Sequence, residues 1–167
     1  MLFRSIIAGA QRPVGRIEST EINLNTSGTI RIAGDVQAGS RQNDNPEKES
    51  DENSVIGNAT LNMLGGGNIN IGGDVRAYHV GGATELNINN VDVNVVGTVK
   101  EFQTINMDEN AKLTAGALVL TANDTLNMTL ASADAYSQID VDTLDANGAT
   151  LNMTVRGAGT YNVVSAN

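Results

Sequence analysis

The side chains that could support catalysis are few and widely separated in this sequence. His79 is the only histidine, and a Ser-His-Asp site would need it, with Asp74 or Asp92 orienting the ring. No G-x-S-x-G stretch or comparable nucleophile context accompanies it. We therefore expect His79 to lie in a turn after a short strand and to take no part in catalysis.

A second set of candidate ligands is the acidic stretch IDVDTLDANG. Asp140, Asp142 and Asp145 supply hard oxygen ligands at a density that suits calcium. Asp140 and Asp142 alternate with Ile139 and Val141, however, as the outward residues of a strand do. The stretch also lacks the glycine-aspartate nonapeptide of calcium β-rolls. We expect a solvated strand face here, with calcium binding as the alternative.

Two further aspartates could take part in carbohydrate cleavage, which uses clustered carboxylates. Asp35 and Asp74 occupy the same position of two similar blocks, but Thr98 replaces them in the next block. Both aspartates follow a glycine, so turn capping explains them. Aromatic platforms for sugars are scarce, because aromatic residues are 3% of the chain. We predict no catalysis, no cofactor and no metal, and keep an extracellular polysaccharide-acting enzyme as the alternative.

A short repeated motif sets the framework in which these side chains must lie. The tetrapeptide TLNM occurs three times, and looser copies read TEINL, TELNI and TINM. The central asparagines of successive copies are 39, 25, 19, 21 and 25 residues apart, and such spacings are typical of solenoid coils. These asparagines are Asn23, Asn62, Asn87, Asn106, Asn127 and Asn152.

Apolar and polar residues alternate within the motif, which predicts a strand with Leu and Met inside and Thr and Asn outside. Four of the five methionines follow a central asparagine, a regularity that a β-sandwich would not require. We expect the asparagines of stacked strands to form a ladder of amide hydrogen bonds on the outer face. The expected inward pairs are Leu61/Met63, Leu86/Ile88, Ile105/Met107, Leu126/Met128 and Leu151/Met153.

A second repeated block follows the motif in the first copies. TIRIAGDVQA (Thr29–Ala38) matches NINIGGDVRA (Asn68–Ala77), and DVNVVGTVKEF (Asp92–Phe102) is a weaker third copy. Each block alternates with period two and turns at Gly-Asp or Gly-Thr, so a coil is expected to contain three short strands. The chain is thus predicted to be all-β: a right-handed single-stranded parallel β-helix of about six coils over residues 17–167.

Two segments depart from this pattern. Arg41–Ser54 carries five carboxylates in fourteen residues and predicts a solvated loop inserted into a coil, the best place for specific contact with a partner. Residues 1–16 are expected to be non-native or poorly ordered, because Leu2–Ser5 read LFRS, which one frame of a common sequencing adaptor would encode.

The Asn/Thr/Gly-rich coils, the absence of cysteine and the closing run ADAYSQIDVDTLDANGATLNMTVRGAGTYNVVSAN resemble the passenger region of Gram-negative autotransporters. The resemblance covers about Ile17 to the end of the chain. It implies a structural, adhesive passenger segment that is secreted or displayed at the outer membrane. It also implies a native chain with a signal peptide and a C-terminal membrane barrel, of which this sequence is expected to be a C-terminal passenger fragment. A host surface or a glycan is the implied ligand.

Composition limits the remaining partners. The net charge is −9, and the ten basic residues are scattered, so a nucleic-acid partner is not expected. A chain without cysteine suits export in an unfolded state. The ends of a solenoid expose strand edges, so the chain is expected to self-associate. An intracellular β-solenoid scaffold is the third alternative.

Overall fold

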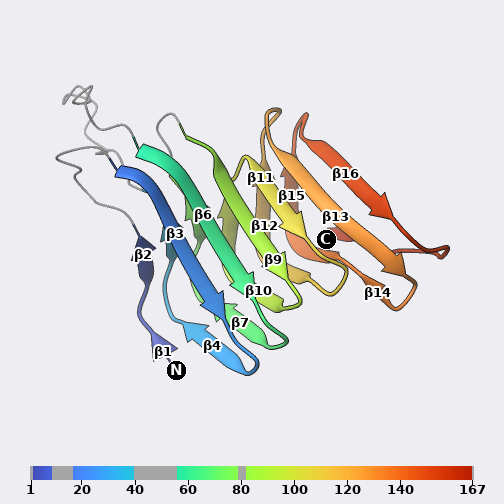
Figure 1. Cartoon of the computed structure of the whole chain (residues 1–167), viewed down its shortest axis with the longest axis horizontal. Helices are drawn as coiled ribbons and strands as arrows, with labels where there is room; N and C mark the ends of the chain where they lie inside the picture. Colours follow the sequence, from blue (N-terminus) through green and yellow to red (C-terminus); the bar gives the residue numbers. More distant parts are fainter. Residues whose placement is uncertain (1, 9–16, 40–55, 79–81, 167) are drawn as a thin grey trace.

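The computed structural model describes residues 2–8, 17–39, 56–78 and 82–166. These residues are all-β: they contain no helix, and their strands form two sheets in which nearly all neighbours run parallel (Figure 1). His79 and the acidic segment Arg41–Ser54 lie outside the described residues.

The first sheet has ten strands. They are β1 (Leu2–Phe3), β2 (Ile6–Ala8), β4 (Thr29–Ile32), β5 (Val36–Ala38), β7 (Asn68–Ile71), β8 (Val75–Ala77), β10 (Asp92–Lys100), β12 (Lys112–Leu120), β15 (Gln138–Ala146) and β17 (Val164–Ala166). Its main order is β1-β4-β7-β10-β12-β15-β17, and the short strands β2, β5 and β8 pair beside that path. Strands β1 and β2 lie within the segment that was expected to be non-native or poorly ordered.

The second sheet has seven strands. They are β3 (Ile17–Asn25), β6 (Ile56–Leu64), β9 (Thr84–Asn89), β11 (Thr104–Met107), β13 (Thr125–Ser132), β14 (Ala135–Tyr136) and β16 (Thr150–Val155). Only β14 runs antiparallel, against β13. The chain therefore crosses from one sheet to the other and back, and each return places a strand beside its predecessor in the same sheet (Figure 1).

Register follows the sequence repeats in both sheets. Thr29–Ala38 and Asn68–Ala77 pair residue for residue through β4 with β7 and β5 with β8, as their similarity predicted. The third block differs: β10, β12 and β15 each run for nine residues, with a register shift between Val95 and Thr98 of β10. The expected division into short strands is therefore present where a bend separates β4 from β5 and β7 from β8, whereas β10, β12 and β15 are each one long strand.

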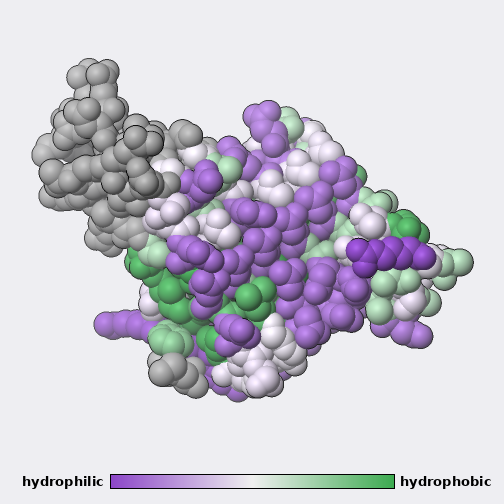
Figure 2. Space-filling view, in the orientation of Figure 1, coloured by the Kyte–Doolittle hydropathy of each residue, from purple (hydrophilic) through white to green (hydrophobic). Residues whose placement is uncertain are grey.

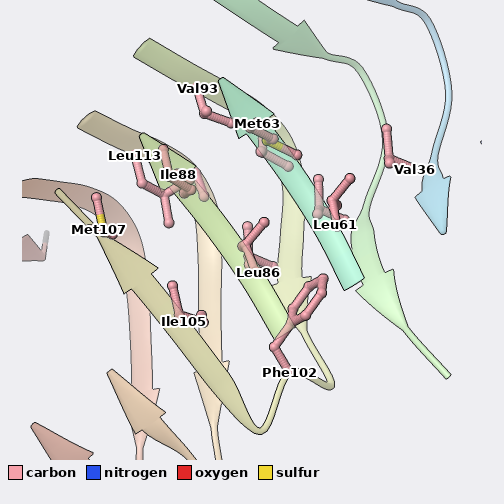
Figure 3. Packing of buried hydrophobic residues seen from close by; sticks show 14 of the residues in the cluster. Val36, Leu61, Met63, Leu86, Ile88, Val93, Phe102, Ile105, Met107 and Leu113 are labelled. Atoms are coloured by element: carbon pink, nitrogen blue, oxygen red, sulfur yellow. The ribbon is translucent and has the colours of Figure 1, made fainter. Parts of the chain in front are cut away.

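The core lies between the two sheets. Inward residues of the repeated motif meet inward residues of the first sheet in one continuous apolar cluster. Figure 3 shows Met63, Ile88 and Met107 on neighbouring strands of the second sheet, with Val93 and Leu113 from the first. All five are at most 3% exposed. Because the pleat has period two, one apolar slot in the motif becomes one continuous buried column.

One expected inward pair is not buried. Leu151 and Met153 continue the columns of Leu126 and Met128, but they are 47% and 50% exposed. Strand β16 pairs only with β13 among the described strands, and β17, which follows it into the first sheet, has three residues. The prediction of a buried pair was therefore wrong at this end, because register fixes direction while burial needs a neighbour on each side.

Candidate binding face

The outer face of the second sheet carries a continuous amide ladder. Each central asparagine after Asn23 donates an Nδ2 hydrogen to Oδ1 of the equivalent asparagine in the preceding strand, at 2.7–3.0 Å. The ladder runs through Asn23, Asn62, Asn87, Asn106, Asn127 and Asn152. Parallel in-register pairing brings these amides within reach, so the ladder expected from the motif is present.

The ladder has a direction. All five bonds point from the C-terminal strand to the N-terminal one, so every interior asparagine is both donor and acceptor. At the first strand, Nδ2 of Asn23 donates to Glu21 of its own strand at 3.1 Å. At the last strand, Oδ1 of Asn152 accepts no hydrogen bond from the described residues. The two ends of the ladder are therefore chemically different: one offers a donor and the other an acceptor.

A column of hydroxyls and carboxylates lies beside the ladder. Its members are Glu21, Thr60, Glu85, Thr104, Thr125 and Thr150. Glu21 accepts a second amide hydrogen from Asn62 at 3.0 Å, and Glu85 accepts one from Asn106 at 2.7 Å. Figure 2 shows hydrophilic residues spread over this face of the molecule. The face can therefore present rows of amide and hydroxyl groups to a ligand, and the distance between neighbouring strands sets the spacing within each row.

We expect an asparagine inside the ladder to contribute more to the free energy of unfolding than an asparagine at its end. Asn87→Asp keeps the oxygen that accepts from Asn106 but replaces the donor to Asn62 with a second acceptor. We expect a loss of about 1–2 kcal/mol in unfolding free energy at neutral pH. Acid should restore part of it, because a protonated carboxyl can donate. Asn152→Asp, on an exposed strand where water replaces the bond, should cost less in the same urea titrations.

The two glycine-preceded aspartates cap turns in the first sheet. Oδ1 of Asp35 accepts from the backbone N–H of Asp74 at 2.9 Å, and Oδ1 of Asp74 accepts from that of Thr98 at 3.0 Å. Lys100 lies 3.2 Å from the other oxygen of Asp74. Both aspartates thus bind a turn backbone, as expected, but each one accepts from the following block, 39 or 24 residues further along the chain, and not from its own turn. The N–H of Thr98 is the largest cause of a lowered pKa at Asp74, with Lys100 lowering it further and burial opposing both.

The lowered pKa of Asp74 makes a testable contribution to acid stability. Folding favours the ionised carboxylate, so its contribution is complete above the ordinary aspartate pKa of 3.8 and is lost as the pH falls through the lowered value. Asp74→Asn should therefore destabilise the chain at pH 7, and the difference from wild type should shrink below that pKa. Urea titrations across this pH range measure it.

The candidate calcium ligands lie apart from the caps, on β15. Asp140, Asp142 and Asp145 are all exposed there, and Ile139 and Val141, on either side of Asp140, are buried, as the alternation predicted. Within the described residues, no three acidic, histidine or cysteine side chains are grouped as a metal site requires.

A hollow of about 300 Å³ at one corner was not anticipated from the sequence. It is lined by Ala77, Tyr78, Glu101, Gln103, Thr121 and Asp124. Glu101 takes a left-handed backbone conformation, with φ of 67°, and the guanidinium of Arg76 lies 5.3 Å from the Tyr78 ring centre. These residues come from three turns of the chain that share no motif, so no sequence signal could have grouped them.

Comparison of the chain with protein-family models, curated proteins and solved structures finds no match in any of the three. The part of the chain that the structure describes has no helix capable of crossing a membrane.

Proposed function

We propose that the chain is a right-handed single-stranded parallel β-helix of about six coils that serves as a structural segment of a secreted or cell-surface passenger. It displays a binding surface and performs no catalysis. The observation that carries the proposal is the side-by-side, in-register pairing of the six motif strands, with the amide ladder outside and apolar columns inside.

This arrangement suits display because each added coil extends the same surface. The interior is filled by the coil's own apolar residues, so outward side chains are free to vary without loss of the core. The outer face combines amides, hydroxyls and two carboxylates that already accept hydrogen bonds. Such a face fits an extended hydroxyl-rich ligand, and we therefore assign a glycan or a glycan-coated host surface as the partner.

The autotransporter resemblance supplies the wider setting of this proposal. A passenger of that class is exported to the outer surface of a Gram-negative cell and joined to a C-terminal membrane barrel. A cysteine-free chain with a repetitive parallel core is compatible with export in an unfolded state followed by coil-by-coil folding.

Surface display tests the proposal directly. The chain, placed between a signal peptide and an autotransporter barrel, should reach the surface of Gram-negative cells and confer binding to glycan-coated surfaces. Thr125→Lys, on the outer face of the second sheet, should reduce that binding, whereas Val96→Lys, which is exposed on the first sheet, should not.

The same purified chain separates the alternatives. Release of reducing ends from a polysaccharide would contradict the proposal and favour the enzyme. Failure to bind any glycan or cell, together with failure to reach the surface, would favour an intracellular scaffold.

A further inference from the structure

The corner hollow has the composition of a site for one small ring with polar edges. Its volume of about 300 Å³ lies at the lower end of the range for small-molecule sites. Tyr78 supplies an aromatic ring to its lining, and the polar side chains there are Glu101, Gln103, Thr121 and Asp124. An aromatic surface beside several hydrogen-bonding groups suits a ligand that has apolar C–H faces and hydroxyl groups at its edge.

Asp124 brings a largely buried carboxylate to this hollow, and one of its oxygens is left for a ligand. The residue is only 7% exposed. Its Oδ2 accepts from the backbone N–H of Thr121 at 2.6 Å, whereas its Oδ1 accepts no hydrogen bond from the described residues. A ligand hydroxyl that reaches this second oxygen would form a charge-assisted hydrogen bond at a place where little water competes.

Glu101 brings a second carboxylate to the hollow, although its backbone conformation is strained. Its φ of 67° lies in the left-handed region, which glycine adopts without strain and glutamate does not. The next residue, Phe102, is 1% exposed, so the core anchors the turn that carries Glu101 on one side of the ring and Gln103 on the other. Strain that is held in place by a packed core is typical of functional positions. A carboxylate is thus kept where the backbone alone would favour glycine.

The charge at the hollow is of one sign. Glu101 and Asp124 are acidic, and no basic side chain is among the described residues of the lining. Arg76 lies near, with its guanidinium 5.3 Å from the centre of the Tyr78 ring, but it also forms an ion pair with Asp35 at 3.5 Å, which offsets its charge. A site with two carboxylates and no cation in its lining disfavours ligands that are themselves anionic.

We infer that the hollow binds one uncharged sugar residue and excludes acidic sugars, an inference that rests on the proposed glycan-binding function and deepens it. Gln103 is followed directly by Thr104 of the hydroxyl column on the outer face. Asp124 is followed in the same way by Thr125. A glycan whose terminal residue occupies the hollow can therefore continue across that face. The hollow selects the terminal sugar, and the rows of amides and hydroxyls hold the chain that follows it.

Pairs of sugars that differ only by a carboxylate test the charge selection. D-glucose with D-glucuronate, D-galactose with D-galacturonate, and D-mannose with D-mannuronate are compared by saturation-transfer NMR on the purified chain, at neutral pH and with EDTA present. We expect at least one neutral sugar to bind and its acid counterpart to fail. The inference is overturned if no neutral sugar binds, if the acids bind as well as their neutral partners, or if binding appears only when calcium replaces EDTA, because a metal ion would then occupy the hollow.

Substitutions at Glu101 separate a role in binding from a role in folding. Glu101→Gly removes the carboxylate and relieves the left-handed backbone, so the urea midpoint should rise. Binding of the neutral sugar should nevertheless weaken about tenfold or more, as expected for the loss of one hydrogen bond to a charged group. Glu101→Gln keeps the shape of the side chain and should reduce the preference for neutral over acidic sugars. Asp92→Asn, which removes another exposed carboxylate at the opposite end of β10, should leave sugar binding unchanged.

Surface display distinguishes this inference from the function on which it rests. A displayed chain with Glu101→Gly should lose most of its binding to surfaces coated with neutral glycans. If it binds like wild type while Thr125→Lys reduces binding, the inference about the hollow fails and the proposed function stands. If the purified chain binds a neutral sugar but the displayed wild type binds no glycan-coated surface, the hollow remains a sugar site and the proposed display function fails.

Discussion

Leu86→Ala should lower the free energy of unfolding by about 3 kcal/mol, whereas Leu151→Ala should lower it by less than about 1 kcal/mol. Both leucines occupy the same slot of the motif and the same column of the second sheet. Leu86 is 1% exposed and lies between Leu61 and Ile105, so its truncation leaves a cavity that neighbouring strands cannot fill. Leu151 has a column neighbour on one side only and already contacts water.

The comparison isolates burial from sequence context, because the two sites share residue type, strand position and flanking asparagine. Urea titrations of both variants and wild type, at concentrations where the chain is monomeric, give the two differences. The slope with denaturant should be unchanged in both variants if unfolding is cooperative. Equal costs at the two sites would contradict the structure, because they would mean that Leu151 is buried as deeply as Leu86.

The motif strands were predictable because one short pattern fixes three properties at once. Alternation in TLNM sets which side chains point inward, the repeated slot sets the register, and register places Asn62 beside Asn87 and Met63 beside Ile88. Each of these consequences follows from local geometry of parallel strands. The same reasoning predicted a turn-capping role for Asp35 and Asp74 within their own turns, whereas each carboxylate accepts from the backbone of the next block.

Other features depend on contacts that no repeat encodes. Phe102 is the largest fully buried side chain among the described residues, yet it lies at the end of the third block, where the sequence pattern weakens. The exposure of Leu151 depends on the length of β17, a strand outside the motif. The corner hollow joins Tyr78 to Asp124 across nearly two further turns of chain. The burial of Phe102, the exposure of Leu151 and the position of the hollow all depend on tertiary contacts and not on residue type.

The turn between β6 and β7 provides the second large expected effect. Gly65 has φ of 110°, a conformation that residues with a Cβ rarely adopt, and a Cβ there would overlap the carbonyl oxygen of Thr26 in the stacked turn beneath it. We expect Gly65→Ala to cost about 3 kcal/mol, from left-handed strain of about 1–2 kcal/mol and overpacking of about 1–3 kcal/mol. Gly66→Ala is the matched control, because a Cβ at the next residue meets only Asn90, at 3.7 Å.

A third substitution separates strain from overlap at this turn. Asn90 takes the equivalent position in the next turn with φ of 50°, so asparagine tolerates the left-handed region there. Gly65→Asn should nevertheless be almost as destabilising as Gly65→Ala, because its Cβ meets the same Thr26 oxygen. Thermal and urea unfolding of the three variants measure the difference. If Gly65→Asn were as stable as wild type, backbone strain alone would explain the glycine, and the close stacking of successive turns would not be what constrains it.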